Sequence, residues 1–231
     1  MAKKGSSKKG SRKREVKILR DNAMGVTRPA LVRILRKAGG VRASTLLWTE
    51  LRAYMMSATR ALMSKVVAVT EYDGHKTVKE LYVHAAVRSM GLDLAIGVAR
   101  VGSSSRLTKT VIYHTGEKTG ETTRRAKSGR VALREVRFYQ QNSDTLTIPR
   151  EAMKRVIRET AQDFSLGMKF TKRALILIQA IIEAYLIQLS EIAVRLALHA
   201  DRKAVYPKDL QVANSIATMS KLAGSLGRIH V

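Results

Sequence analysis

Apolar residues along this chain follow a helical period in two separate stretches. Between residues 45 and 72 there is no Gly or Pro, and apolar side chains recur at intervals of three and four. The positions in this stripe are Leu47, Leu51, Met55, Ala58, Leu62, Val66 and Val69. The pattern predicts one long helix, about 42 Å in length, that ends at Asp73-Gly74.

Two shorter helices are predicted on either side of this long one. Thr27 can cap the first, because Pro29 then falls in the first turn, where its missing N–H costs little. The pair Gly39-Gly40 ends that helix, and a loop follows over residues 41–44. Thr77 and Glu80 have the spacing of a capping box, which predicts a third helix to about Met90.

The second half repeats this short–long–short order after one additional helix at about 131–141. A short helix is expected from Pro149 to about Ser165, before Gly167. A long helix follows over about 171–200, and a loop over 201–206. The last helix begins at Pro207 and runs to about Met219.

The second long helix contains the most apolar segment of the chain, ALILIQAIIEAYLIQL at residues 174–189. A membrane span needs about 20 mostly apolar residues and rarely tolerates a central acid, so Glu183 favours a buried helix instead. Two short neighbours cannot cover such a helix. We therefore expect an all-α protein whose two halves pack on each other, with two unrelated helical domains as the alternative.

Charge narrows the possible functions. The 231 residues include 43 Lys and Arg but only 18 Asp and Glu, which gives a net charge of +25. Such a field attracts a polyanion, either nucleic acid or an acidic membrane surface. Positive charge is dense in a Gly- and Ser-rich arm, residues 1–15, and in a Ser-, Thr- and Gly-rich linker, residues 95–130. Within the linker, residues 110–114 fit either a short strand or a segment docked on the protein.

Catalytic chemistry finds no support in the sequence. The chain has no Cys, which excludes a thiolate zinc site and a Cys nucleophile. Its five His show no metal-ligand spacing. The segment TGEKTGET at 115–122 lacks the Gly-Lys-Thr order of a phosphate loop. We expect no enzyme, no metal, no cofactor and no small-molecule ligand.

Several long motifs resemble the core histone family. VKILRDNAMGVTRPAL at 16–31, VRASTLLWTELR at 41–52 and KTVKELYV at 76–83 resemble histone H-four. VALREVRFYQ at 131–140, RETAQDF at 158–164, EAYL at 183–186 and PKDLQVA at 207–213 resemble histone H-three. The chain as a whole resembles a fused H-four–H-three doublet, an arrangement found in large DNA viruses.

The resemblance implies two histone folds, residues 16–94 and 131–219, packed as a handshake pseudo-heterodimer, with a C-terminal tail at 220–231. Histones wrap double-stranded DNA through phosphate contacts and minor-groove arginines, without reading base sequence. The implied location is a viral particle and a viral factory in the host cytoplasm, or the nucleus. The alternatives are a histone-fold scaffold in a transcription complex and a general basic RNA-binding protein, although the latter usually has stacking aromatics.

The resemblance also assigns candidate DNA contacts. Arg42 matches the family's minor-groove arginine in the first loop, and Lys169 replaces an Arg in the equivalent loop of the second half. Asp201 stands where the family has Lys, which weakens the case for a contact there. The other candidates are basic residues of the second loop and of the short and additional helices, namely Lys76, Arg33, Arg36, Lys37, Arg134, Arg137, Arg150, Arg155 and Arg158.

Two protein interfaces are implied in the same way. A second copy of the chain is expected to bind at positions where two H-three copies meet, with Arg202 and Asp209 paired across the loop. These positions are Leu196, His199, Arg202, Asp209 and Val212. A second doublet, resembling fused H-two-B and H-two-A, is expected at the far end of the first half. That surface contains Val69, Tyr72 and Ala85.

Overall fold

The computed structural model describes residues 22–90, 129–142 and 145–226. The N-terminal arm, most of the linker including residues 110–114, and the last five residues lie outside the described residues. The first half contains η1 Asn22–Gly25, α1 Arg28–Lys37, β1 Arg42–Ala43, α2 Leu47–Tyr72, β2 Thr77–Val78 and α3 Glu80–Ser89. The second half contains α5 Arg130–Gln141, α6 Arg150–Gln162, β3 Lys169–Phe170, α7 Lys172–His199, β4 Ala204–Val205 and α8 Pro207–Leu226.

The expected helices are present, but two of their ends differ from the sequence interpretation. The capping box was wrong, because Thr77 lies in β2 and Lys79 is the residue that precedes α3. Pairing of β2 with β3 holds Thr77 in an extended conformation, which keeps it out of the helix. Helix α8 continues to Leu226, beyond the expected end at Met219. Thr27 precedes α1 as expected but makes no capping hydrogen bond through its side chain. Thr171 caps α7, since its side chain accepts a hydrogen bond from the Ala174 N–H at 3.3 Å.

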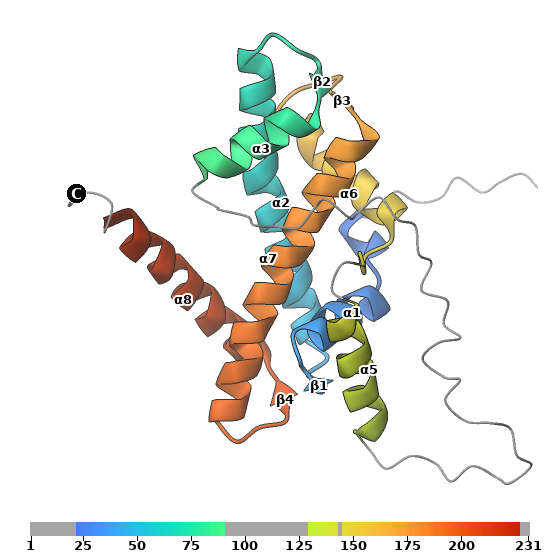
Figure 1. Ribbon diagram of the computed structural model, residues 1–231, viewed down its shortest axis with the longest axis vertical. Coiled ribbons are helices and arrows are strands. Elements are labelled where there is room, and N and C mark those ends of the chain that lie inside the picture. Colours follow the sequence, from blue (N-terminus) through green and yellow to red (C-terminus); the bar gives the residue numbers. More distant parts are fainter. Residues whose placement is uncertain (1–21, 91–128, 143–144, 227–231) are drawn as a thin grey trace, which may run out of the picture.

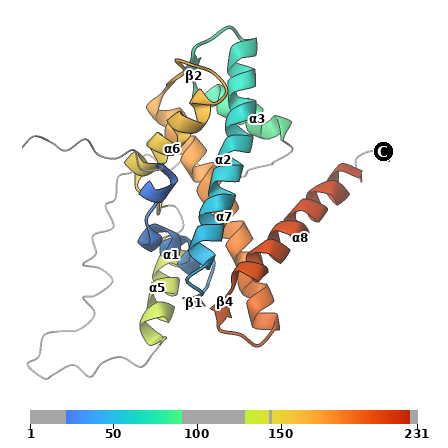
Figure 2. The ribbon, with the colours of Figure 1, turned by 180° about the vertical axis from the view of Figure 1, so that it is seen from behind.

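The two long helices, α2 and α7, run side by side through the centre of the molecule (Figures 1 and 2). On α2 most of the predicted stripe is buried, while Ala58 and Val69 are partly exposed. Helix α7 is long and apolar enough to cross a membrane by length and composition, yet 61% of its most apolar window is buried inside the protein. One hydrophobic cluster includes residues of both halves, so α7 serves as a core helix.

Four two-residue strands tie the halves together at both ends of the long helices. β1 pairs in parallel with β4, and β2 pairs in parallel with β3. Each pair therefore joins a loop of the first half to a loop of the second half. The position and register of these strands were not predicted from the sequence, because strands of two residues are too short to leave a periodic pattern.

Candidate nucleic-acid interface

The paired loops bring basic residues of the two halves next to each other. At one end the register places Arg42 opposite Ala204, so Lys203 precedes the partner strand. At the other end Thr77 lies opposite Lys169, and the Lys169 N–H donates to the Lys76 carbonyl at 2.9 Å. The side chains of Arg42, Lys76 and Lys169 are all exposed. Each end therefore presents at least two basic residues from different halves.

Helix N-termini lie beside these basic residues. Helix α2 begins four residues after β1, and α7 begins directly after β3 at Lys172. The backbone N–H groups of a helix N-terminus carry a partial positive charge that favours phosphate. Lys172 and Arg173 are exposed in the first turn of α7 and add to this field. Sequence reasoning missed these two residues, although their place next to the loop carrying Lys169 was a usable signal.

The end formed by β1 and β4 also contains a cavity of about 580 Å³. Its lining includes Arg28, Arg42, Trp48 and Tyr206. The Arg28 guanidinium lies over the Trp48 ring at 5.6 Å, a cation–π contact that keeps this arginine at the cavity. The Trp48 indole N–H is buried and has no hydrogen-bond partner among the described residues. Positive charge and aromatic surface are thus combined at one of the two paired-loop ends.

Helix α6 carries three exposed arginines, Arg150, Arg155 and Arg158. Its other face is buried through Met153, Val156, Ile157 and two small residues. An ion pair with Lys154 lowers the pKa of the exposed Glu151 carboxyl, first through a hydrogen bond and then through charge. The α6 arginines remain available to an external anion.

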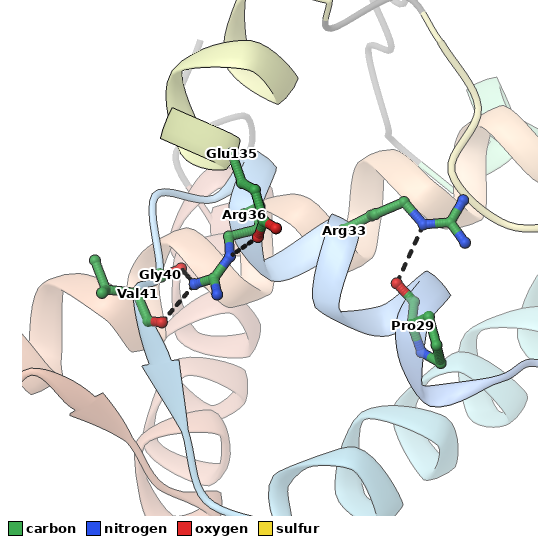
Figure 3. Close-up of polar contacts among 6 residues, drawn as sticks. All are labelled: Pro29, Arg33, Arg36, Gly40, Val41 and Glu135. Carbon is green, nitrogen blue, oxygen red and sulfur yellow. Dashed lines mark hydrogen bonds and ion pairs between the residues drawn. The ribbon is translucent and has the colours of Figure 1, made fainter. Parts of the chain in front are cut away.

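The basic residues of α1 have internal partners, unlike those of α6. Arg36 donates through Nε to Glu135 Oε2 on α5 at 3.0 Å, and its Nη1 donates to the Gly40 and Val41 carbonyls (Figure 3). Lys37 is only 7% exposed and donates to the Thr145 carbonyl. These contacts correct the expectation that Arg36 and Lys37 face DNA. Their side chains instead hold α5 and the loop before α6.

Arg33 is intermediate between these two situations. Its Nε donates to the Pro29 carbonyl within α1 (Figure 3), and its Nη1 donates to the Thr147 carbonyl at 3.2 Å. The side chain is partly exposed. On α5, Arg134 and Arg137 are both exposed, and Val136 is the buried residue of this helix.

Two comparisons with known proteins show what this chain is similar to. Residues 128–216 match the family described as "Core histone H2A/H2B/H3/H4 domain". The match lies in the second half of the chain, from just before α5 into α8. The crystal structure of the histone from Methanopyrus kandleri is similar over 81% of this chain and 92% of that chain, with a TM-score of 0.50 and 17% identity. This likeness shows that the chain has a histone fold.

Within the matched segment, Arg202 and Asp209 form the expected pair across the loop before α8. The guanidinium binds the carboxylate through two hydrogen bonds, of 3.0 and 2.8 Å, and the Tyr206 N–H donates to the same carboxylate at 2.8 Å. Burial raises the pKa of Asp209, but these hydrogen bonds and the Arg202 charge outweigh it and hold that pKa below 3.8. The hydrogen bond to Asp209 likewise raises the pKa of Arg202.

The two candidate protein interfaces have apolar residues open to solvent. Near the Arg202–Asp209 pair, His199 is exposed, Leu196 is half-buried, and Val212 is 49% exposed. At the far end of the first half, Tyr72 is 92% exposed, Ala85 is exposed, and Val69 is half-buried. The two groups lie on different elements, near the end of α7 in the first case and near the end of α2 in the second.

A buried carboxylate on α7 anchors the loop before α6, and the sequence did not predict this contact. Glu183 is 3% exposed and accepts hydrogen bonds from the Thr147 N–H, the Thr147 hydroxyl and the Ile148 N–H at 2.7, 2.8 and 3.0 Å. Gln179 donates to the same carboxylate at 2.8 Å. The only signal was an acid at the centre of an apolar helix, which indicates a buried polar contact without naming its partner.

Metal binding has no candidate in the described part of the chain. Residues 22–90, 129–142 and 145–226 contain no group of three or more His, Cys, Asp or Glu side chains that could hold an ion.

Proposed function

We propose that this chain is a structural histone doublet that wraps and compacts double-stranded DNA without sequence preference. In this proposal, residues 16–94 and 131–219 are two histone folds that pack in a handshake, and the chain has no catalytic role. The match of residues 128–216 to the core histone domain supports the second fold. The likeness to the Methanopyrus kandleri histone, which extends over 81% of the chain, supports a fold that includes both halves.

The observation that carries the proposal is the pairing of loops between halves. The exposed basic residues Arg42, Lys76 and Lys169 lie at or next to the strand pairs β1–β4 and β2–β3, at the two ends of the long helices. The 26 residues of α2 separate these ends by roughly 39 Å. This exceeds the rise of one turn of duplex DNA, about 34 Å. A duplex that contacts both ends is therefore held at more than one groove, as wrapping requires.

Assembly is proposed through the two exposed apolar groups. A second copy of the chain is expected at Val212, Leu196 and His199, and a separate doublet at Tyr72. A glutamate introduced into each apolar group distinguishes self-association from binding of the partner doublet. Val212→Glu should abolish self-association while leaving the partner doublet bound, and Tyr72→Glu should do the reverse. Light scattering of each variant with and without the partner measures this; equal assembly of Tyr72→Glu and wild type would refute the second interface.

Nuclease digestion of long DNA reconstituted with the full chain tests the function. We expect a discrete protected fragment, either with this chain alone or only with a partner doublet. Replacing Arg42, Lys76 and Lys169 together by Gln should shorten or abolish this fragment. The control replaces Lys65, Arg88 and Arg195 by Gln and changes the net charge equally. These exposed residues lie within α2, α3 and α7, away from the paired strands. A smear from wild type in both conditions would contradict wrapping and favour a scaffold or RNA-binding role.

A further inference from the structure

Helix α5 is held against the protein by few apolar contacts. Of its twelve residues only Val136 is buried, whereas Val131 and Leu133 are 43% and 52% exposed. A helix of this length is marginal by itself in water and depends on tertiary contacts. Polar contacts to α1 therefore carry a large share of its anchoring.

The main polar contact is the ion pair between Arg36 and Glu135. Their side chains are 14% and 22% exposed, so solvent screens this pair less than a surface pair. The guanidinium is fixed from its other side by the Gly40 and Val41 carbonyls, just beyond the end of α1 (Figure 3). Arg36 thus presents an oriented donor to α5. A second, longer contact runs from Gln140 Nε2 to the Lys37 carbonyl at 3.5 Å.

We propose that Glu135 is a positioning residue for DNA binding: its ion pair with Arg36 latches α5 onto α1 and thereby places Arg134 and Arg137 at the DNA. Both arginines are exposed and lie within two residues of Glu135 on the same helix. This inference rests on the proposed DNA-wrapping function. An acidic residue then strengthens the binding of a polyanion.

General electrostatics predicts the opposite effect for Glu135. Neutralising one acid raises the net charge of +25 by one and, by long-range attraction alone, strengthens DNA binding everywhere. If Glu135 acts as a latch, its neutralisation weakens protection only where α5 contacts DNA. If its role is merely structural, protection falls along the whole bound duplex. A long-range charge effect, a latch and a merely structural role therefore predict changes in DNA protection that differ in position and sign.

The test uses the full chain and the variant Glu135→Gln, which keeps the size of the side chain. The control is Glu71→Gln, an exposed acid one residue from the end of α2. That end of α2 lies far from α5 in both views (Figures 1 and 2). Two measurements are made: hydrogen exchange of the free protein over residues 131–141, and position-resolved hydroxyl-radical footprinting of DNA bound to it.

We expect Glu135→Gln to raise exchange in α5 by at least about fivefold, because a charge-assisted hydrogen bond is lost. Exchange in α2 and α7 should not change. In the footprint, one segment should lose protection while the rest stays as in wild type. Glu71→Gln should leave both measurements unchanged or bind DNA slightly more tightly.

Unchanged exchange in α5 would overturn the latch itself, whether or not the protein wraps DNA. Increased exchange with an unchanged, uniformly stronger or uniformly weaker footprint would overturn its role in DNA binding. If wild type gives no footprint, the proposed function fails together with the DNA part of this inference, while the exchange data still report on the ion pair.

Discussion

Helices α1 and α6 look alike in sequence but use their basic residues differently. Each is a short amphipathic helix beside a long one, and each carries three basic residues that the sequence offered as DNA contacts. Those of α6 are all exposed, whereas all three on α1 donate to internal acceptors. The difference arises because α5 and the loop 145–148 lie against α1 and offer it a carboxylate and two carbonyls. A basic residue can thus hold a fold together or bind an external anion, and its neighbours determine which.

The strongest test of this comparison removes the support of the loop that faces α1. Glu183→Ala leaves the Thr147 and Ile148 N–H groups buried without acceptors. We expect the free energy of unfolding to fall by about 3 to 5 kcal/mol, measured by urea denaturation. Glu191→Ala, half-buried on the same helix, is the control and should cost less than about 1 kcal/mol. Similar losses in both variants would show that the loop is not anchored through Glu183.

Arg202, like Arg36, is an arginine whose partner lies within the protein. Asp209→Asn should lower the free energy of unfolding at pH 7 by about 2 kcal/mol, because the charged partner of Arg202 is lost. The folded pKa of Asp209 is lowered, so the stabilisation by this carboxylate is present above about pH 3.8 and is lost as the pH falls through the lower, folded value.

The difference between wild type and Asp209→Asn should therefore shrink as the pH falls below 3.8. Asp201→Asn is the matched control, since Asp201 is exposed and its positive φ of 53° is one that Asn tolerates. A pH-independent difference between wild type and Asp209→Asn would contradict the assignment.

Replacing Lys37 should lower the stability of the fold by a smaller amount. Lys37→Met keeps the aliphatic stem but removes the ammonium that donates to the Thr145 carbonyl. We expect a loss of about 1 kcal/mol in the free energy of unfolding, with no change in DNA affinity beyond that of one distant charge. Lys65→Met, exposed on α2, should change stability by less than about 0.5 kcal/mol. Thermal melts with and without DNA compare the two.

The smallest effect is expected for an outward-facing pair. Arg60 donates to Asp163 at 3.2 Å, and both side chains are about half exposed. Because solvent and salt screen such a pair, Arg60→Ala should cost no more than about 0.5 kcal/mol at 150 mM salt. A loss of 2 kcal/mol would mean that exposure is a poor guide to the role of basic residues here.

The sequence predicted the helices well and the placement of side chains between helices poorly. Periodic apolar positions, together with Pro149, Pro207 and the Gly39-Gly40 pair, were sufficient to locate the helices, because these signals are local. Thr77 and Glu80 had the spacing of a capping box, but a strand contact from the other half determined the structure there. The internal contact of Arg36 could not be predicted from the sequence of α1, since its partner Glu135 is 99 residues away along the chain.

The candidate site was predicted unevenly for the same reason. Residues in loops and on the exposed face of α6 were identified through family resemblance and are exposed in the structure. The Arg202–Asp209 pair was also anticipated through the resemblance and is present in the structure. Lys203 became a candidate only through the pairing of β1 with β4, which places its strand beside Arg42. Lys172 and Arg173 follow Lys169 closely in the sequence and could have been identified from it.

The salt dependence of DNA binding by two variants tests this comparison most directly. One variant replaces Arg150, Arg155 and Arg158 of α6 by Gln. The other replaces Arg33 and Lys37 of α1 and keeps Arg36, so that the ion pair that holds α5 stays intact. Each phosphate contact contributes about 0.9 to the slope of log K against log salt. We expect the α6 variant to lose close to three such increments with little change in melting temperature. We expect the α1 variant to melt earlier and to lose at most about one increment. An unchanged slope in the α6 variant, or a loss of about two increments in a stably folded α1 variant, would contradict the comparison.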